Sequence, residues 1–279
     1  MADLPTTPAT AQPRRHFDVR LMFAGALTLA LALSACGSTS THTSSKAAAK
    51  AASGSAPAST SGAAQSAHDR AIAGQGLLRP SDFPSGWTAG PREVESTPSQ
   101  IKDEAAACLH VSPALLQEPQ PNEVKSPKFK DRTTGASVAN SVAIGPTEAP
   151  ASAYLRALKE PQAPACLSSA FQKELTKSLG REAHKLPAGF SIGKLGFQAV
   201  SFPAEGTTST AYRITLPVTD HGVTVASYYL DAILVQVGRA YMSMTFDGSV
   251  TPVKSSMEQE LAGAAVRRLQ SALGLPVGT

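Results

Sequence analysis

Apolar and polar residues alternate most clearly in the C-terminal third of the chain, where they predict an antiparallel sheet. Four apolar runs have the length and the β-branched or aromatic content of strands. They span residues 196–202, 210–218, 223–237 and 240–246. The short sequences Asp220-His221-Gly222 and Gly238-Arg239 separate the last three runs and are typical of tight turns. The pattern therefore predicts a meander, in which Met242, Met244 and Phe246 point to one buried face.

Helical periodicity surrounds these strands on both sides. The predicted helices span residues 99–109, 113–116, 147–158, 164–179 and 253–273, and a further strand spans 137–144. We expect Ser112 and Thr147 to cap the second and third helices. Ser255 and Glu258 have the spacing of a capping box at the start of the last helix, and Glu260 is expected on its solvated face. The order of the elements predicts an α+β fold, an antiparallel sheet with helices packed on it.

The first 35 residues have the order of a bacterial lipoprotein signal peptide. A basic segment ending at Arg20 precedes residues 21–33, which carry no charge and are too few to span a bilayer as a helix. The sequence LSAC at 33–36 follows and resembles a lipobox, in which cleavage occurs before the cysteine and its thiol is acylated. We therefore expect Cys36 to carry the lipid anchor (palmitate in a labelling experiment), which holds the mature chain to the membrane.

The route of export stays open. Arg14 and Arg15 resemble the start of a twin-arginine signal, but Asp18 stands close to the pair in place of an apolar segment. The general secretory pathway is the alternative.

Residues 36–68 are predicted to be a disordered tether that begins at the lipidated cysteine. After Cys36 the segment consists mostly of Ser, Thr, Ala and Gly and contains no large apolar side chain. Such a composition buries too little area to offset the entropy of ordering the chain. The globular, extracytoplasmic part is accordingly predicted at 69–279, as a single domain.

Two cysteines remain once Cys36 is assigned to the lipid. In an exported chain, Cys108 and Cys166 are expected to form a disulfide bond. A bond between them would contribute roughly 4 kcal/mol by restricting the unfolded chain. The alternative is a pair of free buried thiols, and no CxxC motif or paired histidines favour a metal site.

Composition restricts the partners. The chain has 279 residues, of which 42% are hydrophobic and 16% charged, and its net charge is +4. Removal of the signal peptide lowers this charge to near +3. A charge this mild argues against nucleic acid as a partner. The expected location is the outer face of the cell membrane.

The sequence contains no motif of a known catalytic site. GxSxG, HExxH, a Walker loop and a dinucleotide fingerprint are all absent, so we expect a protein that is not an enzyme and that needs no cofactor. The histidines of the globular part are isolated from one another in sequence. His221, in a predicted turn, is expected to be solvated.

Four residues are candidates for contact with a ligand. Asp231 interrupts the apolar run YYLDAILVQV, where a carboxylate is costly unless it is paired or hydrated, so it either faces solvent at a sheet edge or lines a ligand cleft. Trp87, the only tryptophan, either closes over the sheet at the ligand or fills the core. Tyr228 and Tyr229 are amphipathic side chains of the kind that line small-ligand sites, although strands favour tyrosine in any case.

The order of several segments resembles a known group of proteins. The segment LLRPSDFPSGW (77–87) comes first. A cysteine on a predicted helix follows it, and a second cysteine begins another helix. After these come the strands FQAVSFP (197–203), AYRITL (211–216) and VQVGRAYMSMTF (235–246). This order is similar to that of actinobacterial secreted lipoproteins and of the extracellular sensor domains of mycobacterial PknH-like kinases. The resemblance covers most of residues 77–273 and implies an antiparallel sheet with helices around a cleft, and a sensor or envelope-binding role. The kinase domains have two disulfides, whereas only one is possible here, and the resemblance supplies no catalytic residue.

Three functions remain open at this point. The first is a non-enzymatic envelope lipoprotein that binds a small ligand, a lipidic ligand or a wall component. The second is an envelope hydrolase or transferase whose site residues are scattered in the sequence. The third is an envelope protein that docks a membrane kinase or transporter. The first is the expectation, because an anchor, a tether and a domain without catalytic motifs are the parts that it needs.

Overall fold

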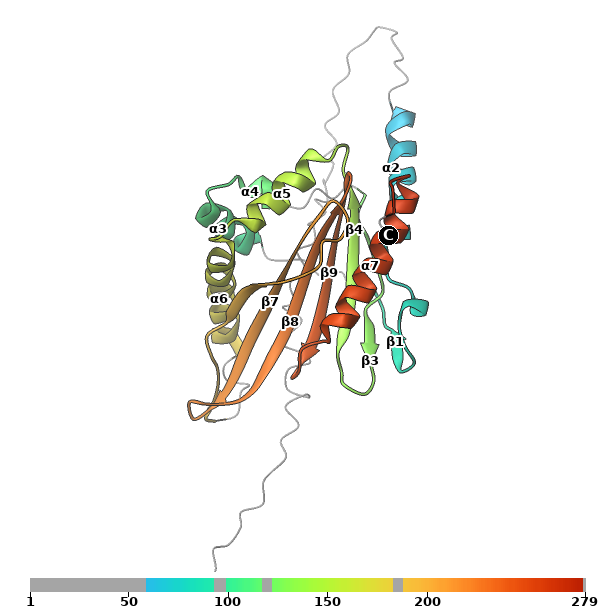
Figure 1. Cartoon of the computed structure of the whole chain (residues 1–279). Coiled ribbons are helices and arrows are strands. Elements are labelled where there is room, and N and C mark those ends of the chain that lie inside the picture. The colour runs from blue at the N-terminus through green and yellow to red at the C-terminus, as the bar shows by residue number, and fades with distance from the viewer. Residues whose placement is uncertain (1–58, 93–98, 117–121, 183–187, 278–279) are drawn as a thin grey trace, which may run out of the picture. The chain divides into compact units, whose positions relative to one another are not determined.

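One antiparallel sheet of nine strands organises the described part of the chain. A computed structural model describes residues 59–92, 99–116, 122–182 and 188–277 (Figure 1). The predicted signal peptide, Cys36 and the predicted tether up to residue 58 lie outside the described residues. The α+β class predicted from the sequence is confirmed.

The strands run in the order β1-β3-β4-β9-β8-β7-β5, with β2 paired to β4 and β6 paired to β7. Their bounds are β1 Trp87–Ala89, β2 Val124–Lys125, β3 Phe129–Asp131, β4 Ser137–Ile144, β5 Phe190–Ile192, β6 Gly196–Val200, β7 Thr208–Asp220, β8 Val223–Val237 and β9 Ala240–Ser249. Strands β7, β8 and β9 form the predicted meander. The sequence pattern missed β1, β2, β3 and β5, because segments of two or three residues are too short to show an alternating period.

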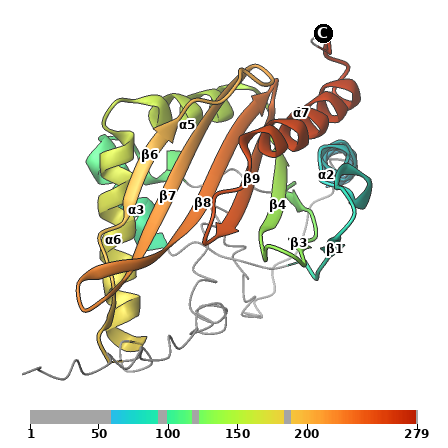
Figure 2. The same ribbon diagram turned by 60° about the horizontal axis from the view of Figure 1, so that its bottom comes forward.

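Helices cover both faces of the sheet (Figures 1 and 2). They are α2 Ser59–Gln75, α3 Ser99–Leu109, α4 Pro113–Leu116, α5 Ala149–Lys159, α6 Ala163–Glu182 and α7 Ser255–Ala272, and a 3-10 turn, η1, spans Pro80–Asp82. Helices α2 and α7 pack on one face, while α5 and α6 pack on the other, over β6, β7 and β8. None of these helices has the length and apolar content needed to cross a membrane.

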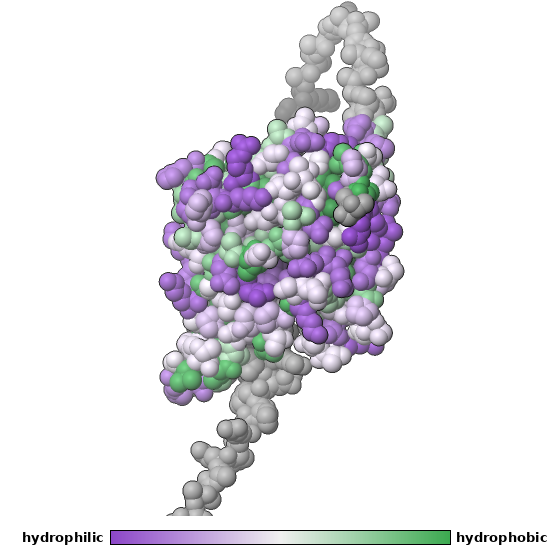
Figure 3. All heavy atoms as spheres, in the orientation of Figure 1, coloured by the Kyte–Doolittle hydropathy of each residue, from purple (hydrophilic) through white to green (hydrophobic). Residues whose placement is uncertain are grey.

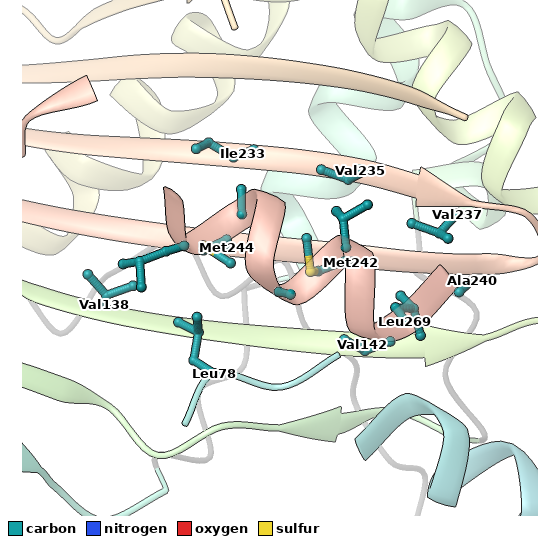
Figure 4. Packing of buried hydrophobic residues seen from close by; sticks show 14 of the residues in the cluster. Leu78, Val138, Val142, Ile233, Val235, Val237, Ala240, Met242, Met244 and Leu269 are labelled. Carbon is teal, nitrogen blue, oxygen red and sulfur yellow. The ribbon is translucent and has the colours of Figure 1, made fainter. Parts of the chain in front are cut away.

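Large apolar side chains fill the face under α2 and α7. Strand register places Val142 of β4 opposite Met242 of β9, which lies opposite Val235 of β8. These three residues are fully buried, and Leu269 of α7 packs on the same cluster (Figure 4). The predicted burial of Met242, Met244 and Phe246 is confirmed. This face is the main hydrophobic core, whose burial is the dominant stabilising term.

The opposite face of the same two central strands carries small and hydroxyl-bearing side chains. Ser141 of β4 lies opposite Ser243 of β9, and their hydroxyl oxygens are 2.9 Å apart. Ala139 and Thr245 form the next pair on this face. Helix α5 reaches only the end of β9, where the rings of Tyr154 and Tyr241 meet edge to face. The two sides of β4 and β9 are therefore packed very differently.

Helix α2 begins ten residues before the predicted start of the domain. The predicted tether extended to residue 68, but Ser59–Gln75 is helical, so this boundary is wrong. Asp69 is buried and accepts a hydrogen bond of 2.5 Å from Arg239 Nη2, and that guanidinium lowers the pKa of Asp69. Tertiary contacts of this kind stabilise a helix whose composition alone does not.

The segment after α2 is fixed by one arginine of α7. Arg268 donates hydrogen bonds to the carbonyl oxygens of Gln75 and Leu77 and to both carboxylate oxygens of Asp82, at 2.8–3.1 Å. Asn140 of β4 binds the same segment from the sheet, accepting from the Leu78 N–H at 2.9 Å. The sequence LLRPSDFPSGW, which supported the resemblance, thus has a structural role here.

The ends of two helices differ from the prediction. Helix α5 begins at Ala149, and its N-cap is Glu148 instead of Thr147. Helix α7 begins at Ser255, and its N-cap, Lys254, makes no side-chain capping hydrogen bond. The predicted capping box of Ser255 and Glu258 is therefore wrong.

The predicted disulfide is present. Cys108 on α3 and Cys166 on α6 are bonded, with their Cα atoms 5.5 Å apart. The bond joins two helices that also pack against each other. It is typical of a domain that folds in an oxidising compartment.

Candidate functional site

Asp231 lies in the core and is paired there with an arginine. It is opposite Arg213 in the β7–β8 ladder, and it accepts two hydrogen bonds from that guanidinium, from Nε at 2.7 Å and from Nη2 at 2.6 Å. The Asp231 side chain is only 3% exposed. The hydrogen bonds to Asp231 raise the pKa of Arg213, because they stabilise its charged form. A parallel pair of bonds of this kind is the strongest form of arginine–carboxylate contact.

A second carboxyl group, Glu258 of α7, completes this buried cluster. Glu258 is 4% exposed, and burial together with the neighbouring Asp231 raises its pKa to about 8. It is consequently mostly protonated at neutral pH. The cluster then holds one cation, one anion and one neutral carboxyl, so its charges balance inside the core. We call Arg213, Asp231 and Glu258 the buried cluster.

The expectation that Asp231 faces solvent at a sheet edge is wrong, because β8 lies between β9 and β7 and the side chain is buried. Helix α7 covers the face of β8 to which the Asp231 side chain points. The sequence also placed Glu258 as a helix cap, whereas the structure buries it. The buried cluster links α7 to the sheet.

The four predicted ligand-contacting residues do not form one site. Tyr228 and Tyr229 are neighbours on β8 and therefore point to opposite faces, and only Tyr229 shares the face of Asp231. Trp87 lies on β1. In the sheet, β1 is four strand positions from β8, a distance of about 19 Å. Its ring packs on Phe83 with the centroids 5.0 Å apart, and it contacts the main core. The structure thus agrees with the reading of Trp87 as part of the core.

An open groove runs along α6 beside the β5–β6 connection. Its volume is about 730 Å³, within the range of small-ligand sites. The residues that line it share one face of the helix, at a spacing of three and four positions, and one further residue comes from the β5–β6 connection. They are Ala165, Ser168, Ser169, Gln172, Lys173, Thr176, Lys177 and Lys194. We call this feature the α6 groove.

Two hydrogen bonds to α6 hold the β5–β6 connection in place beside this groove. The N–H of Leu195 donates to Gln172 Oε1 at 2.7 Å, and the Ser168 hydroxyl donates to the carbonyl of Leu195 at 3.5 Å. On the other side of Lys194, the N–H of Gly193 donates to the carbonyl of Pro217 at 2.8 Å. The side chain of Lys194 is exposed, and hydrogen bonds fix the backbone of both neighbouring residues.

The α6 groove is positively charged. Lys173 and Lys177 lie one helical turn apart and are 66% and 45% exposed. Each is near a carboxylate, Lys173 at 3.1 Å from Glu104 and Lys177 at 3.8 Å from Glu174. The exposed pair of Lys173 and Glu104 contributes little to stability, so an incoming anion can replace it at low cost. In the described ranges Lys194 has no carboxylate within salt-bridge distance.

The described residues contain no group of three His, Cys, Asp or Glu side chains that could hold a metal ion. The one histidine–carboxylate contact of the hairpin turn joins His221 and Asp220 at 3.7 Å, and the His221 side chain is 82% exposed. This agrees with the solvated turn that the sequence predicted.

Sequence reasoning missed the α6 groove altogether. Its polar positions recur at helical spacing in SSAFQKELTK, a pattern that equally describes any solvated helix face. Only the fold shows that the β5–β6 connection places Lys194 beside them. Comparison with known proteins does not indicate a site, because no family model and no curated protein match this chain.

Proposed function

We propose that this chain is a lipid-anchored protein of the outer face of the cell membrane whose globular domain is a non-enzymatic binding or sensor module. The α6 groove is its ligand-contacting surface. The observation that carries the proposal is that this groove is open, has the volume of a ligand site and presents exposed polar side chains on a fixed backbone. Asp231, the charged candidate from the sequence, is instead paired with Arg213 in the core.

The signal-like N-terminus and the disulfide support the location. LSAC at 33–36 supplies the acylation site, and Cys108–Cys166 is typical of an oxidising compartment. Growth with labelled palmitate tests the anchor. We expect label and membrane attachment in the natural chain and neither in Cys36→Ala. Labelled, membrane-bound Cys36→Ala would overturn the anchor.

The groove is tested by blocking it in the full chain. Ser169 is exposed in the groove, so a tryptophan at this position fills the groove without disturbing the core. Ser271→Trp, at an exposed position near the end of α7, is the matched control. Each protein is purified from its own host, and the material released on denaturation is identified by mass spectrometry.

We expect one class of released molecule with the natural chain and with Ser271→Trp, and its loss with Ser169→Trp. Equal release from both variants would place the ligand elsewhere. No released molecule from the natural chain would contradict the proposal of a tight ligand-binding module.

A second candidate function, docking of a membrane protein, is favoured by the tip of the β7–β8 hairpin. Val223 and Val225 are 67% and 51% exposed there, and Figure 3 shows hydrophobic colour at this end of the hairpin. Such a patch is typical of a contact surface. If docking is the function, Val223→Lys with Val225→Lys abolishes cross-linking to a membrane partner in whole cells, and Ser169→Trp leaves it intact.

A further inference from the structure

The α6 groove is long, because its lining follows one helix. Its lining extends along α6 from Ala165 to Lys177, which is about 18 Å of helix. An open groove of this length accommodates an extended chain. The exposed large apolar residues of the described chain, which a membrane-binding surface needs, are Val223, Val225, Val250 and Val277, and none of them lines the groove.

The groove combines cations with hydroxyl and amide groups. Lys173, Lys177 and Lys194 provide ammonium groups, and no carboxylate is part of the lining. The hydroxyls of Ser169 and Thr176 can donate or accept hydrogen bonds. A ligand that matches this set carries anionic groups and several hydroxyls along an extended chain.

From this combination we propose that the α6 groove binds an acidic glycan, an extended sugar chain that bears carboxylate or phosphate groups. Lys194 is the residue that distinguishes this site from an ordinary solvated helix. It faces the two helical lysines from the β5–β6 connection, and its neighbours Gly193 and Leu195 are hydrogen-bonded on either side. An acidic peptide fits less well, because acidic peptide motifs are recognised by clusters of arginines, and no arginine lines the groove. The inference rests on the proposed binding function of the same groove.

The test measures the affinity of the purified full chain, in detergent, for named polymers. Polygalacturonate is the carboxylate-bearing glycan, inorganic polyphosphate tests the phosphate group without sugar, and dextran is the neutral glycan. Polyglutamate and phosphatidylglycerol vesicles represent the peptide and the membrane. Lys194→Glu is compared with Lys130→Glu, which makes the same charge change at an exposed position of β3.

We expect polygalacturonate to bind, with polyphosphate weaker and dextran undetectable. Lys194→Glu should weaken the binding of polygalacturonate at least tenfold, while Lys130→Glu should change it by less than twofold. Equal weakening by both variants would mean only that the whole protein attracts anions, and would overturn the site. Preference for polyglutamate or for the vesicles, binding of dextran as strong as that of polygalacturonate, or no binding of any polymer would overturn the ligand class.

The two proposals fail differently. If a molecule is released in the Ser169→Trp experiment but it is uncharged or not a sugar, the binding function stands and the glycan inference is wrong. If no molecule is released and no polymer binds, both are wrong.

Discussion

The buried cluster and the α6 groove both contain charged side chains, and they are built in opposite ways. In the buried cluster, Arg213 holds Asp231 through two hydrogen bonds, and Glu258 fits beside them because it is mostly protonated at neutral pH. In the α6 groove, Lys173 and Lys177 are exposed ammonium groups, and Lys194 makes no ion pair in the part of the chain that the structure describes. Charges that satisfy one another in the core stabilise the fold, whereas exposed charges on a fixed backbone remain available to a ligand. An unusual charged residue in the sequence, such as Asp231, therefore indicates a functional site only if the structure shows that no other side chain pairs with it.

Removing Asp231 should have the largest effect on stability. Asp231→Ala leaves the Arg213 guanidinium partly buried without its partner, and we expect a loss of about 3–5 kcal/mol in the free energy of unfolding. The double variant Arg213→Met with Asp231→Leu replaces the pair by apolar side chains and should lose much less. Chemical denaturation measures both. A loss under about 1 kcal/mol for Asp231→Ala would show that the pair is not important for the fold.

Removal of the disulfide should come next. Cys108 and Cys166 are 58 residues apart, and replacing both by serine should lower the unfolding free energy by roughly 2–4 kcal/mol. Because the bond holds α3 against α6, which carries the α6 groove, the double variant should also bind polygalacturonate more weakly. Reduction of the natural chain should reproduce both effects. Unchanged binding in a destabilised chain would show that α6 keeps its place without the bond.

The buried cluster should make stability depend on pH through Glu258. Its pKa is raised from 4.5 to about 8, so the folded state binds more protons than the unfolded state between these values. The stabilisation is complete below pH 4.5 and is lost as pH rises through about 8, with a slope of up to about 1.4 kcal/mol per pH unit.

Glu258→Gln keeps a neutral hydrogen-bonding side chain, so this part of the slope should disappear. Glu260→Gln, two residues along and exposed, should keep it. Unfolding free energies at pH 5, 6, 7, 8 and 9 measure the difference. Parallel curves for the natural chain and Glu258→Gln would mean that Glu258 is charged in the folded protein.

The smallest effect on stability is expected in the α6 groove. Lys194 is exposed and makes no ion pair in the described ranges, so Lys194→Glu should change the unfolding free energy by less than about 0.5 kcal/mol. The Lys130→Glu control should change the unfolding free energy equally little, and thermal unfolding of both variants measures the two changes. A loss of 2 kcal/mol or more in Lys194→Glu would show that Lys194 is structural.

The sequence predicted the elements whose signals are local. The strand at 223–237 and the helix at 99–109 were predicted to the residue, because their apolar periods and end residues lie within one short window. The pair of Cys108 and Cys166 followed from counting cysteines in an exported chain. The start of α2 was missed, because its stability comes from contacts such as the one between Asp69 and Arg239, 170 residues away.

The buried cluster was out of reach for a more specific reason. The turn at His221 and Gly222 pairs Asp220 with Val223, and continuing that register along the hairpin would place Asp231 opposite Tyr212. A bulge between Val218 and Thr219 shifts the pairing by one residue, so Arg213 comes to face Asp231 instead. Nothing in the sequence of these strands marks the bulge. The spacing of Ser255 and Glu258 likewise looks the same in a cap as in a buried helix face.

The most direct measurement is hydrogen exchange of the full chain with and without polygalacturonate, followed by mass spectrometry. We expect slower exchange at residues 165–177 and 193–196 in the presence of the polymer. No change is expected in the strand segment around Asp231 or in the helix turn around Glu258, because both side chains are buried. Slower exchange confined to these two segments, with none along α6, would show that the ligand does not bind in the α6 groove.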